Sequence, residues 1–159
     1  MVNTKKIRAM KKLMIFAIGV LSVTMLSAAT SIMRSDDMPI KFAELPTEAQ
    51  QFVGKYFGKE EVSHVMKDAE FHGTDYKVVF VSGSKVEFDT NGNWTEIDCR
   101  YSTVPNAIVP DKIESYIKDS YAANKVVEIK RERNEWEVKL TGGLELTFNK
   151  DFQLIDIDD

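Results

Sequence analysis

Two histidines and one cysteine are the residues of this chain most often used in catalysis or metal binding, and their spacing favours neither. His64 and His72 fall in different expected elements, and the sequence has no HExxH, GxSxG, GxGxxG or paired-cysteine pattern. His72 precedes a glycine, which is typical of a solvent-exposed turn. The acidic pairs at 60–61 and 158–159 are interpreted as solvated ends, because general acid–base catalysis needs carboxylates in a pocket with shifted pKa values. The sequence therefore predicts a protein that is not an enzyme.

One segment, 89–93 (DTNGN), carries side-chain oxygens in the order of a calcium-loop fragment. It lacks the later bidentate acid at the required spacing, and its counterpart at 149–152 is not a set of ligands. An Asn-Gly hairpin turn accounts for the segment better than a calcium loop does. We therefore expect no metal and no cofactor.

The composition is that of an ordinary globular domain, with 159 residues of which 43% are hydrophobic and 29% charged. Cys99 follows an expected strand and is predicted to be a half-buried free thiol, with a disulfide bond to another chain as the alternative.

The formal net charge is −4, but the first 29 residues hold five of the 21 basic residues and no acidic one, so the remainder carries −9. A chain this acidic is poorly suited to displace counterions from a phosphate backbone, which argues against nucleic acid as a partner.

The N-terminus has the three-part pattern of a secretory signal. Basic residues ending at Lys12 precede the apolar segment 13–26, and the small residues Ser27 and Ala29 fit a cleavage site after Ala29. The alternative is a membrane anchor, but the apolar segment is shorter than the roughly 20 residues that span a bilayer. We expect a periplasmic or secreted protein that does not insert into a membrane once the signal is removed.

An internal repeat organises the rest of the chain. Pro46 aligns with Pro110 at an offset of 64, and Phe88 aligns with Phe148 at an offset of 60. The change of offset is absorbed by one shorter connection in the second copy, as loops tolerate. In each copy a proline is followed by apolar residues at helical spacing and then by segments with a period of two. Each copy is therefore predicted to be a helix followed by four strands.

The expected strands lie near 62–68, 76–81, 85–89 and 94–99 in the first copy and near 126–131, 135–140, 144–148 and 153–157 in the second. Short turns between them, such as 82–84, force neighbouring strands to run antiparallel. The predicted fold is α+β, a tandem repeat of a helix followed by a four-stranded antiparallel meander, with the helices packed on one sheet face. Because one copy of about 55 residues is marginal for its own core, we expect the two sheets to join or pack together. The expected organisation is a signal peptide at 1–29, a flexible leader at 30–44, and repeats at 45–104 and 105–159.

These residues resemble the PepSY-like family, exported Bacteroidetes proteins with a beta-lactamase-inhibitor-protein-like fold. The resemblance covers 45–158 and rests on patterns shared by the two copies: Leu45-Pro46 with Val109-Pro110, Tyr76-Lys77-Val78 with Trp136-Glu137-Val138, and Val86-Glu87-Phe88-Asp89 through Ile97-Asp98. It implies a tandem helix-plus-sheet fold and a non-enzymatic role in binding or inhibiting another protein. It brings no catalytic residues.

The sheet face turned away from the helices is the predicted binding site. Successive residues of a strand point to opposite faces of the sheet. The apolar residues common to both copies therefore point toward the helices, and the residues between them point outward. In the second copy the outward set is polar, whereas in the first it includes aliphatic residues and a tryptophan within a charged rim that also contains Lys85. The predicted binding residues are Met66, Lys77, Val79, Val81, Glu87, Trp94 and Glu96. Such a mixture is typical of a protein contact surface. In the alternatives, Trp94 folds over the sheet edge, or the two copies hide this face by packing through it.

The sequence thus predicts an exported, non-enzymatic protein that binds another envelope protein through the open sheet face, as an inhibitor or an adaptor. The alternative is a carrier of a small molecule or peptide in a pocket between the sheet and the helices. The negative charge of the mature chain indicates that the partner surface is basic.

Overall fold

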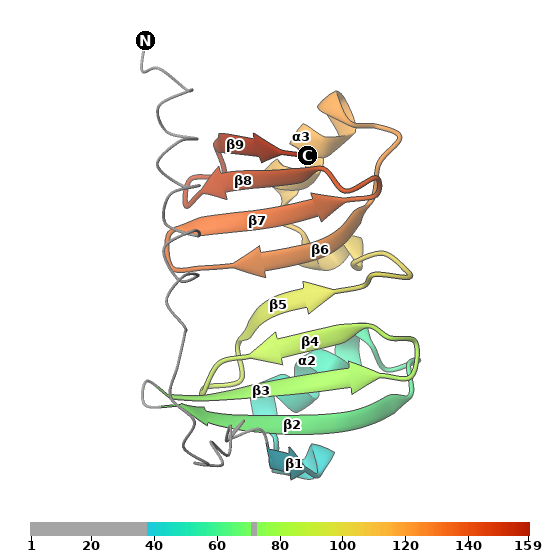
Figure 1. Ribbon diagram of the computed structural model, residues 1–159, viewed down its shortest axis with the longest axis vertical. Coiled ribbons are helices and arrows are strands. Elements are labelled where there is room, and N and C mark those ends of the chain that lie inside the picture. The colour runs from blue at the N-terminus through green and yellow to red at the C-terminus, as the bar shows by residue number, and fades with distance from the viewer. Residues whose placement is uncertain (1–37, 71–72) are drawn as a thin grey trace, which may run out of the picture. The chain divides into compact units, whose positions relative to one another are not determined.

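The computed structural model describes residues 38–70 and 73–159, so the predicted signal peptide and the residues before Met38 lie outside the described residues. The described chain forms one antiparallel sheet of nine strands in chain order, with two α-helices and two short 3-10 helices (Figure 1). The strands are β1 (Met38–Ile40), β2 (Val62–Glu70), β3 (Gly73–Phe80), β4 (Lys85–Phe88), β5 (Trp94–Asp98), β6 (Val126–Arg131), β7 (Glu135–Leu140), β8 (Glu145–Asn149) and β9 (Leu154–Asp158). The helices are η2 (Phe42–Glu44), α2 (Thr47–Tyr56), η3 (Asn106–Ile108) and α3 (Asp111–Ser120). The α+β class is confirmed.

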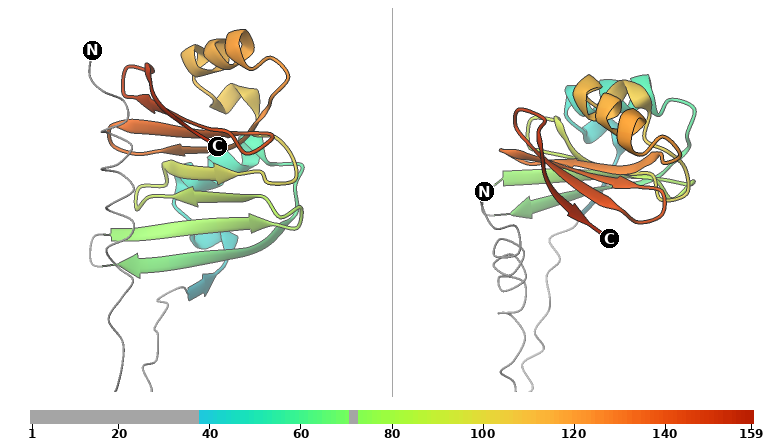
Figure 2. Two further views of the ribbon diagram at one scale, coloured as in Figure 1. Left: turned by 45° about the horizontal axis from the view of Figure 1, so that its top comes forward. Right: turned by 90° about the horizontal axis from the view of Figure 1, so that it is seen from above.

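The two α-helices begin where the sequence predicts. Pro46 and Pro110 are the N-cap residues, and each offers its carbonyl oxygen to the backbone N–H four residues later. Helix α2 buries Ala49 and Val53, while α3 buries its two isoleucines in the same way. Both helices lie on the same face of the sheet (Figure 2).

The strands β2 to β9 agree with the predicted strands to within a few residues. Glycines in the left-handed region close two equivalent turns, where Gly83 donates its N–H to the carbonyl of Phe80 and Gly143 donates to that of Leu140. These short connections keep successive strands adjacent and antiparallel.

The predicted flexible leader is wrong for residues 38–44. Met38 pairs with Lys67 and Ile40 pairs with Val65, which makes β1 the edge strand of the sheet, and η2 follows directly. Ile40 and Phe42 pack against the buried core, and this apolar contact is what fixes the segment.

The two halves of the chain, 45–104 and 105–159, share one continuous sheet and one core. Strand β5 pairs with β6 through Ile97 opposite Ile129 and the residues on either side of them, which confirms the expectation that the sheets join. The core lies between the sheet and the helices, where Phe52 meets Phe88 edge-on at 5.8 Å between ring centroids and Tyr116 meets Phe148 at 5.5 Å.

Cys99 belongs to this core. The residue is 1% exposed, so it is buried and not half-buried as predicted. Burial raises the pKa of the thiol, which keeps it protonated and unreactive. Both its position and its protonation disfavour the alternative of a disulfide bond to another chain.

Candidate functional site

Trp94, the aromatic residue of the predicted binding site, lies on the other face of the sheet. A β-bulge sets Glu87 opposite Glu96 but Phe88 opposite Trp94, so that Thr95 is an extra residue in β5. Strict alternation would place Trp94 on the same face as Glu96. The bulge instead places it beside Phe88, which is fully buried in the core. The prediction that Trp94 faces outward is therefore wrong.

Trp94 belongs to an aromatic row on the helix side of the sheet. Its ring centroid lies 6.3 Å from that of Phe52 on α2 and 5.9 Å from that of Trp136 on β7. Trp136 lies 5.6 Å from Phe152 in the same measure, and the guanidinium of Arg131 lies 4.7 Å from the Trp94 centroid. The row crosses the junction of β5 and β6 and so connects the two halves of the sheet on that side.

Four predicted residues form a single row on the face that α2 and α3 do not cover, which we call the open face (Figure 2). Met66 lies opposite Lys77, Lys77 opposite Glu87, and Glu87 opposite Glu96. All four are half-buried. The pairing of β2 to β5 thus brings them together as the alternation predicts.

Val79 and Val81 occupy different surroundings. Val79 is half-buried on the open face between His64 on β2 and Lys85 on β4. Val81 follows the end of β3, is 64% exposed, and donates its N–H to the carbonyl of Glu61. Val81 therefore lies at a turn beyond the sheet, while His72 lies outside the described residues.

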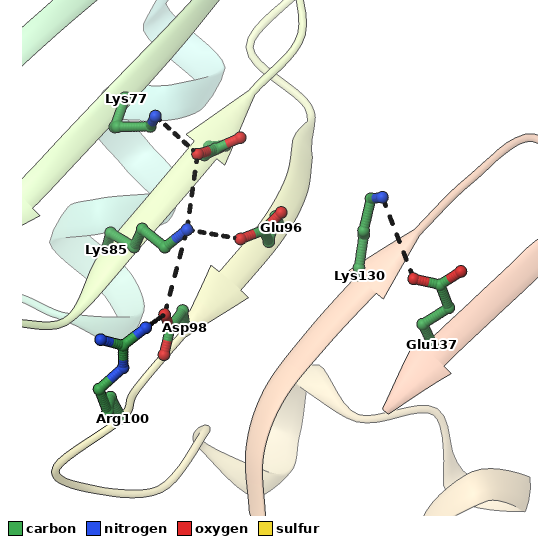
Figure 3. Close-up of polar contacts among 8 residues, drawn as sticks. Lys77, Lys85, Glu96, Asp98, Arg100, Lys130 and Glu137 are labelled. Atoms are coloured by element: carbon green, nitrogen blue, oxygen red, sulfur yellow. Dashed lines mark hydrogen bonds and ion pairs between the residues drawn. The ribbon is translucent and has the colours of Figure 1, made fainter. Parts of the chain in front are cut away.

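Ion pairs join the charged residues of the open face (Figure 3). Lys77 Nζ lies 3.0 Å from Glu87 Oε1, and Lys85 Nζ lies 2.7 Å from Glu96 Oε1. The same Lys85 ammonium is 3.8 Å from Glu87 and 4.0 Å from Asp98. Burial alone would lower the pKa of Lys85, but the hydrogen bond to Glu96 and the nearby carboxylates raise it above its ordinary value. Lys85 is therefore a cation shared by three carboxylates.

The open face continues into the second half, where each strand taken alone has the pattern of ordinary polar surface. Glu96 lies opposite Lys130 on β6, and Lys130 lies opposite Glu137 on β7 at 4.0 Å between their charged atoms. Asp98 lies opposite Glu128 across the same junction. Sequence reasoning missed these residues because their alignment depends on β5 pairing with β6.

Two rows of side chains consequently cross the open face. The first row is Met66, Lys77, Glu87, Glu96, Lys130, Glu137, Thr147 and Asp156. The second row is Val79, Lys85, Asp98, Glu128, Lys139, Glu145 and Asp158. Together they hold eight carboxylates and four lysines, so the open face carries an excess of negative charge.

The carboxylates near the junction perturb one another. Burial, together with the charges of Asp98 and Glu96, raises the pKa of Glu128, and the opposing effect of Lys139 is smaller. Burial also raises the pKa of Glu137. The charged forms of these two glutamates are therefore disfavoured relative to a carboxylate in water.

The segment that resembled a calcium-loop fragment is a turn between β4 and β5. Asp89 Oδ1 accepts hydrogen bonds from the backbone N–H groups of Asn91 and Asn93, both at 2.9 Å. Asn149 Oδ1 accepts the equivalent bonds between β8 and β9. This geometry supports the hairpin-turn interpretation.

Comparison with solved structures finds close relatives. A "putative periplasmic protein" of the DUF2874 family from Bacteroides vulgatus is 40% identical, with 79% of this chain and 99% of that chain covered and a TM-score of 0.77. A "putative calcium-regulated periplasmic protein" from Bacteroides thetaiotaomicron is 42% identical, with 78% and 98% covered and a TM-score of 0.76. A third, a "putative periplasmic protein of unknown function" from Bacteroides vulgatus, is 31% identical, with 77% and 99% covered and a TM-score of 0.74.

These relatives confirm the predicted periplasmic or secreted location. Within the described residues no helix has the length and apolar character needed to cross a bilayer.

A search of curated proteins finds no match. The family model described as "Putative beta-lactamase-inhibitor-like, PepSY-like" matches residues 74–156, which is half of the chain. Given this match and the identity to the Bacteroides structures over most of its length, the chain belongs to the PepSY-like family.

Proposed function

We propose that this protein is an exported, non-enzymatic binding protein that contacts another envelope protein through the open face of its sheet. The observation that carries the proposal is the pair of charged rows on that face, with eight carboxylates against four lysines. A sheet face that bears an excess of one charge attracts a surface of the opposite charge and speeds the encounter. The partner surface is therefore basic.

The binding residues proposed now differ from those predicted from sequence. Met66, Lys77, Val79, Glu87 and Glu96 stay in the site because they lie on the open face. Trp94 leaves it because of the bulge in β5, and Val81 leaves it because it lies in a turn beyond β3. The second-half residues of the two rows are added.

A tandem repeat supports this arrangement, and we include it in the proposal. The register of β2 shifts at Val62, and that of β6 shifts at the aligned Val126. A second bulge follows Glu87 in the first half and the aligned Thr147 in the second. Two copies with the same irregularities present the same face, so one sheet of two units gives a binding surface twice as wide as either unit.

The alternative of a small-molecule carrier has less support. The space between the sheet and the helices holds packed side chains, such as Phe57 stacked on Phe80 at 5.1 Å between ring centroids. Interiors packed in this way leave little room for a ligand. The calcium regulation named for one relative is not part of the proposal, because the Asp89 carboxylate is used by backbone N–H groups of its own turn.

Site-directed photocrosslinking in cells that export the full chain tests the proposal. A photoreactive amino acid at Val79 or Glu145, on the open face, is expected to crosslink to another envelope protein. The same amino acid at Lys55 or Lys118, both exposed on the helices, serves as the matched control. Crosslinks from the helix positions alone, or from neither set, would overturn the proposal.

A further inference from the structure

The junction of β5 and β6 is hollowed on the open face. One hollow of about 160 Å³ is lined by three glutamates and a lysine, Glu96, Glu137, Glu145 and Lys130. A second of about 310 Å³ extends from Asp98 toward the turn between β7 and β8. Glu128 and Lys139 line both hollows, so the two form one shallow groove with Glu128 near its middle.

One pair of like charges in this groove opposes the stability of the free protein. Asp98 and Glu128 lie directly opposite each other on neighbouring strands, where like charges are destabilising. Asp98 has ion-pair partners in Lys85 and Arg100, at 4.0 and 3.7 Å. Glu128 lies opposite Lys139 on β7, whose charge partly offsets this repulsion. Among the ion pairs within 4.0 Å in the described residues, however, none includes Glu128.

An added cation would remove this conflict. An ammonium or guanidinium group placed beside Glu128 would sit within reach of several carboxylates in a partly desolvated groove, where an ion pair is stronger than on an open surface. Local arrangements that cost stability are retained most often at functional sites.

Resting on the proposed function, we infer that the β5–β6 groove binds an extended segment of the partner that carries lysine or arginine side chains, with one of them placed beside Glu128. The segment lies across the junction, so the neighbouring carboxylates of both rows meet further basic side chains. This commits the partner to a basic polypeptide and centres the contact on the junction, where the sequence-predicted Glu96 also lines the groove.

Fluorescence anisotropy with a labelled peptide of eight alternating lysines and serines tests the inference on the exported protein. The probe is expected to bind the wild type, while a peptide with glutamate in place of lysine does not. Glu128→Lys is expected to weaken binding roughly tenfold, since it replaces an attractive charge by a repulsive one. Asp119→Lys, an equal change of net charge at an exposed position on α3, is expected to change binding less than about twofold.

Equal weakening by the two variants would mean that binding follows net charge alone, and would overturn the inference. Failure of the lysine peptide to bind would overturn it as well. Neither result would exclude contact with another envelope protein through the open face, which the crosslinking experiment tests whatever the charge of the partner. If Glu128→Lys does not fold, Glu128→Gln takes its place, with an expected weakening of roughly two- to fivefold against no change for Asp119→Asn.

Discussion

The junction between β5 and β6 has opposite characters on its two faces. On the helix side Ile97 meets Ile129, and neither side chain is exposed to solvent. On the open face, one residue away, Asp98 meets Glu128. The aliphatic pair supplies the cohesion of the junction, while the carboxylate pair weakens it. The halves are therefore held together from the helix side, which leaves the open face available for contacts.

Ile129→Ala is the strongest test of this division. Truncation of a fully buried isoleucine is expected to lower the free energy of unfolding by about 2–5 kcal/mol, through lost burial and the cavity left behind. Denaturant titration followed by circular dichroism measures the change. A loss well under 1 kcal/mol would mean that the helix side does not hold the halves together.

Trp94→Ala is expected to cost about 1–3 kcal/mol, because a half-buried indole loses its contacts with Phe52 and Trp136. Val79→Ala removes a half-buried apolar side chain from the open face and is the matched control, with an expected cost below about 1 kcal/mol. Thermal melts of the two variants rank them. The reverse ranking would mean that the aromatic contacts of Trp94 contribute less to stability than the open-face Val79 does.

Lys85→Met is expected to destabilise the protein by about 1 kcal/mol, since three carboxylates lose their shared cation. Lys77→Met, which breaks the pair with Glu87 at a more exposed position, is expected to cost less than about 0.5 kcal/mol. Chemical denaturation of both variants checks the difference. Equal losses of stability in the two variants would mean that sharing Lys85 among three carboxylates adds no stability beyond that of a single ion pair.

Glu128→Gln is expected to stabilise the protein by a few tenths of a kcal/mol at neutral pH, because it removes a carboxylate that is partly desolvated and is repelled by Asp98 and Glu96. A carboxyl whose pKa is raised by folding contributes stability below its ordinary pKa, and that contribution is lost as the pH rises through the raised value. The advantage of the variant should therefore shrink as the pH falls through this window. Denaturation curves across this range measure it, and a difference that stays constant with pH would contradict an electrostatic origin.

Much of the fold follows from local sequence patterns. Prolines at 46 and 110 predicted the helix starts, and alternation predicted strands β2 to β9, because both signals reside in neighbouring residues. Strand β1 was missed because three residues become a strand only through pairing with β2, which is distant in sequence.

The candidate site was predicted less well, for two physical reasons. The bulge at Thr95 reverses the direction of Trp94, and a prediction that assumes unbroken alternation along the strand cannot place it. The alignment of Asp98 with Glu128 exists only once β5 and β6 pair, so each carboxylate looked like ordinary surface when its own strand was considered alone.

An open sheet of nine strands ends in two edges, and both carry features that oppose growth by addition of another copy. Strand β1 has only three residues, and its central Pro39 has no N–H to offer a new strand. Strand β9 at the opposite edge carries Asp156 and Asp158 and is followed by Asp159, charges that repel the same strand of a second molecule. The short, proline-containing β1 and the acidic β9 therefore oppose edge-to-edge aggregation of this wide sheet in the envelope.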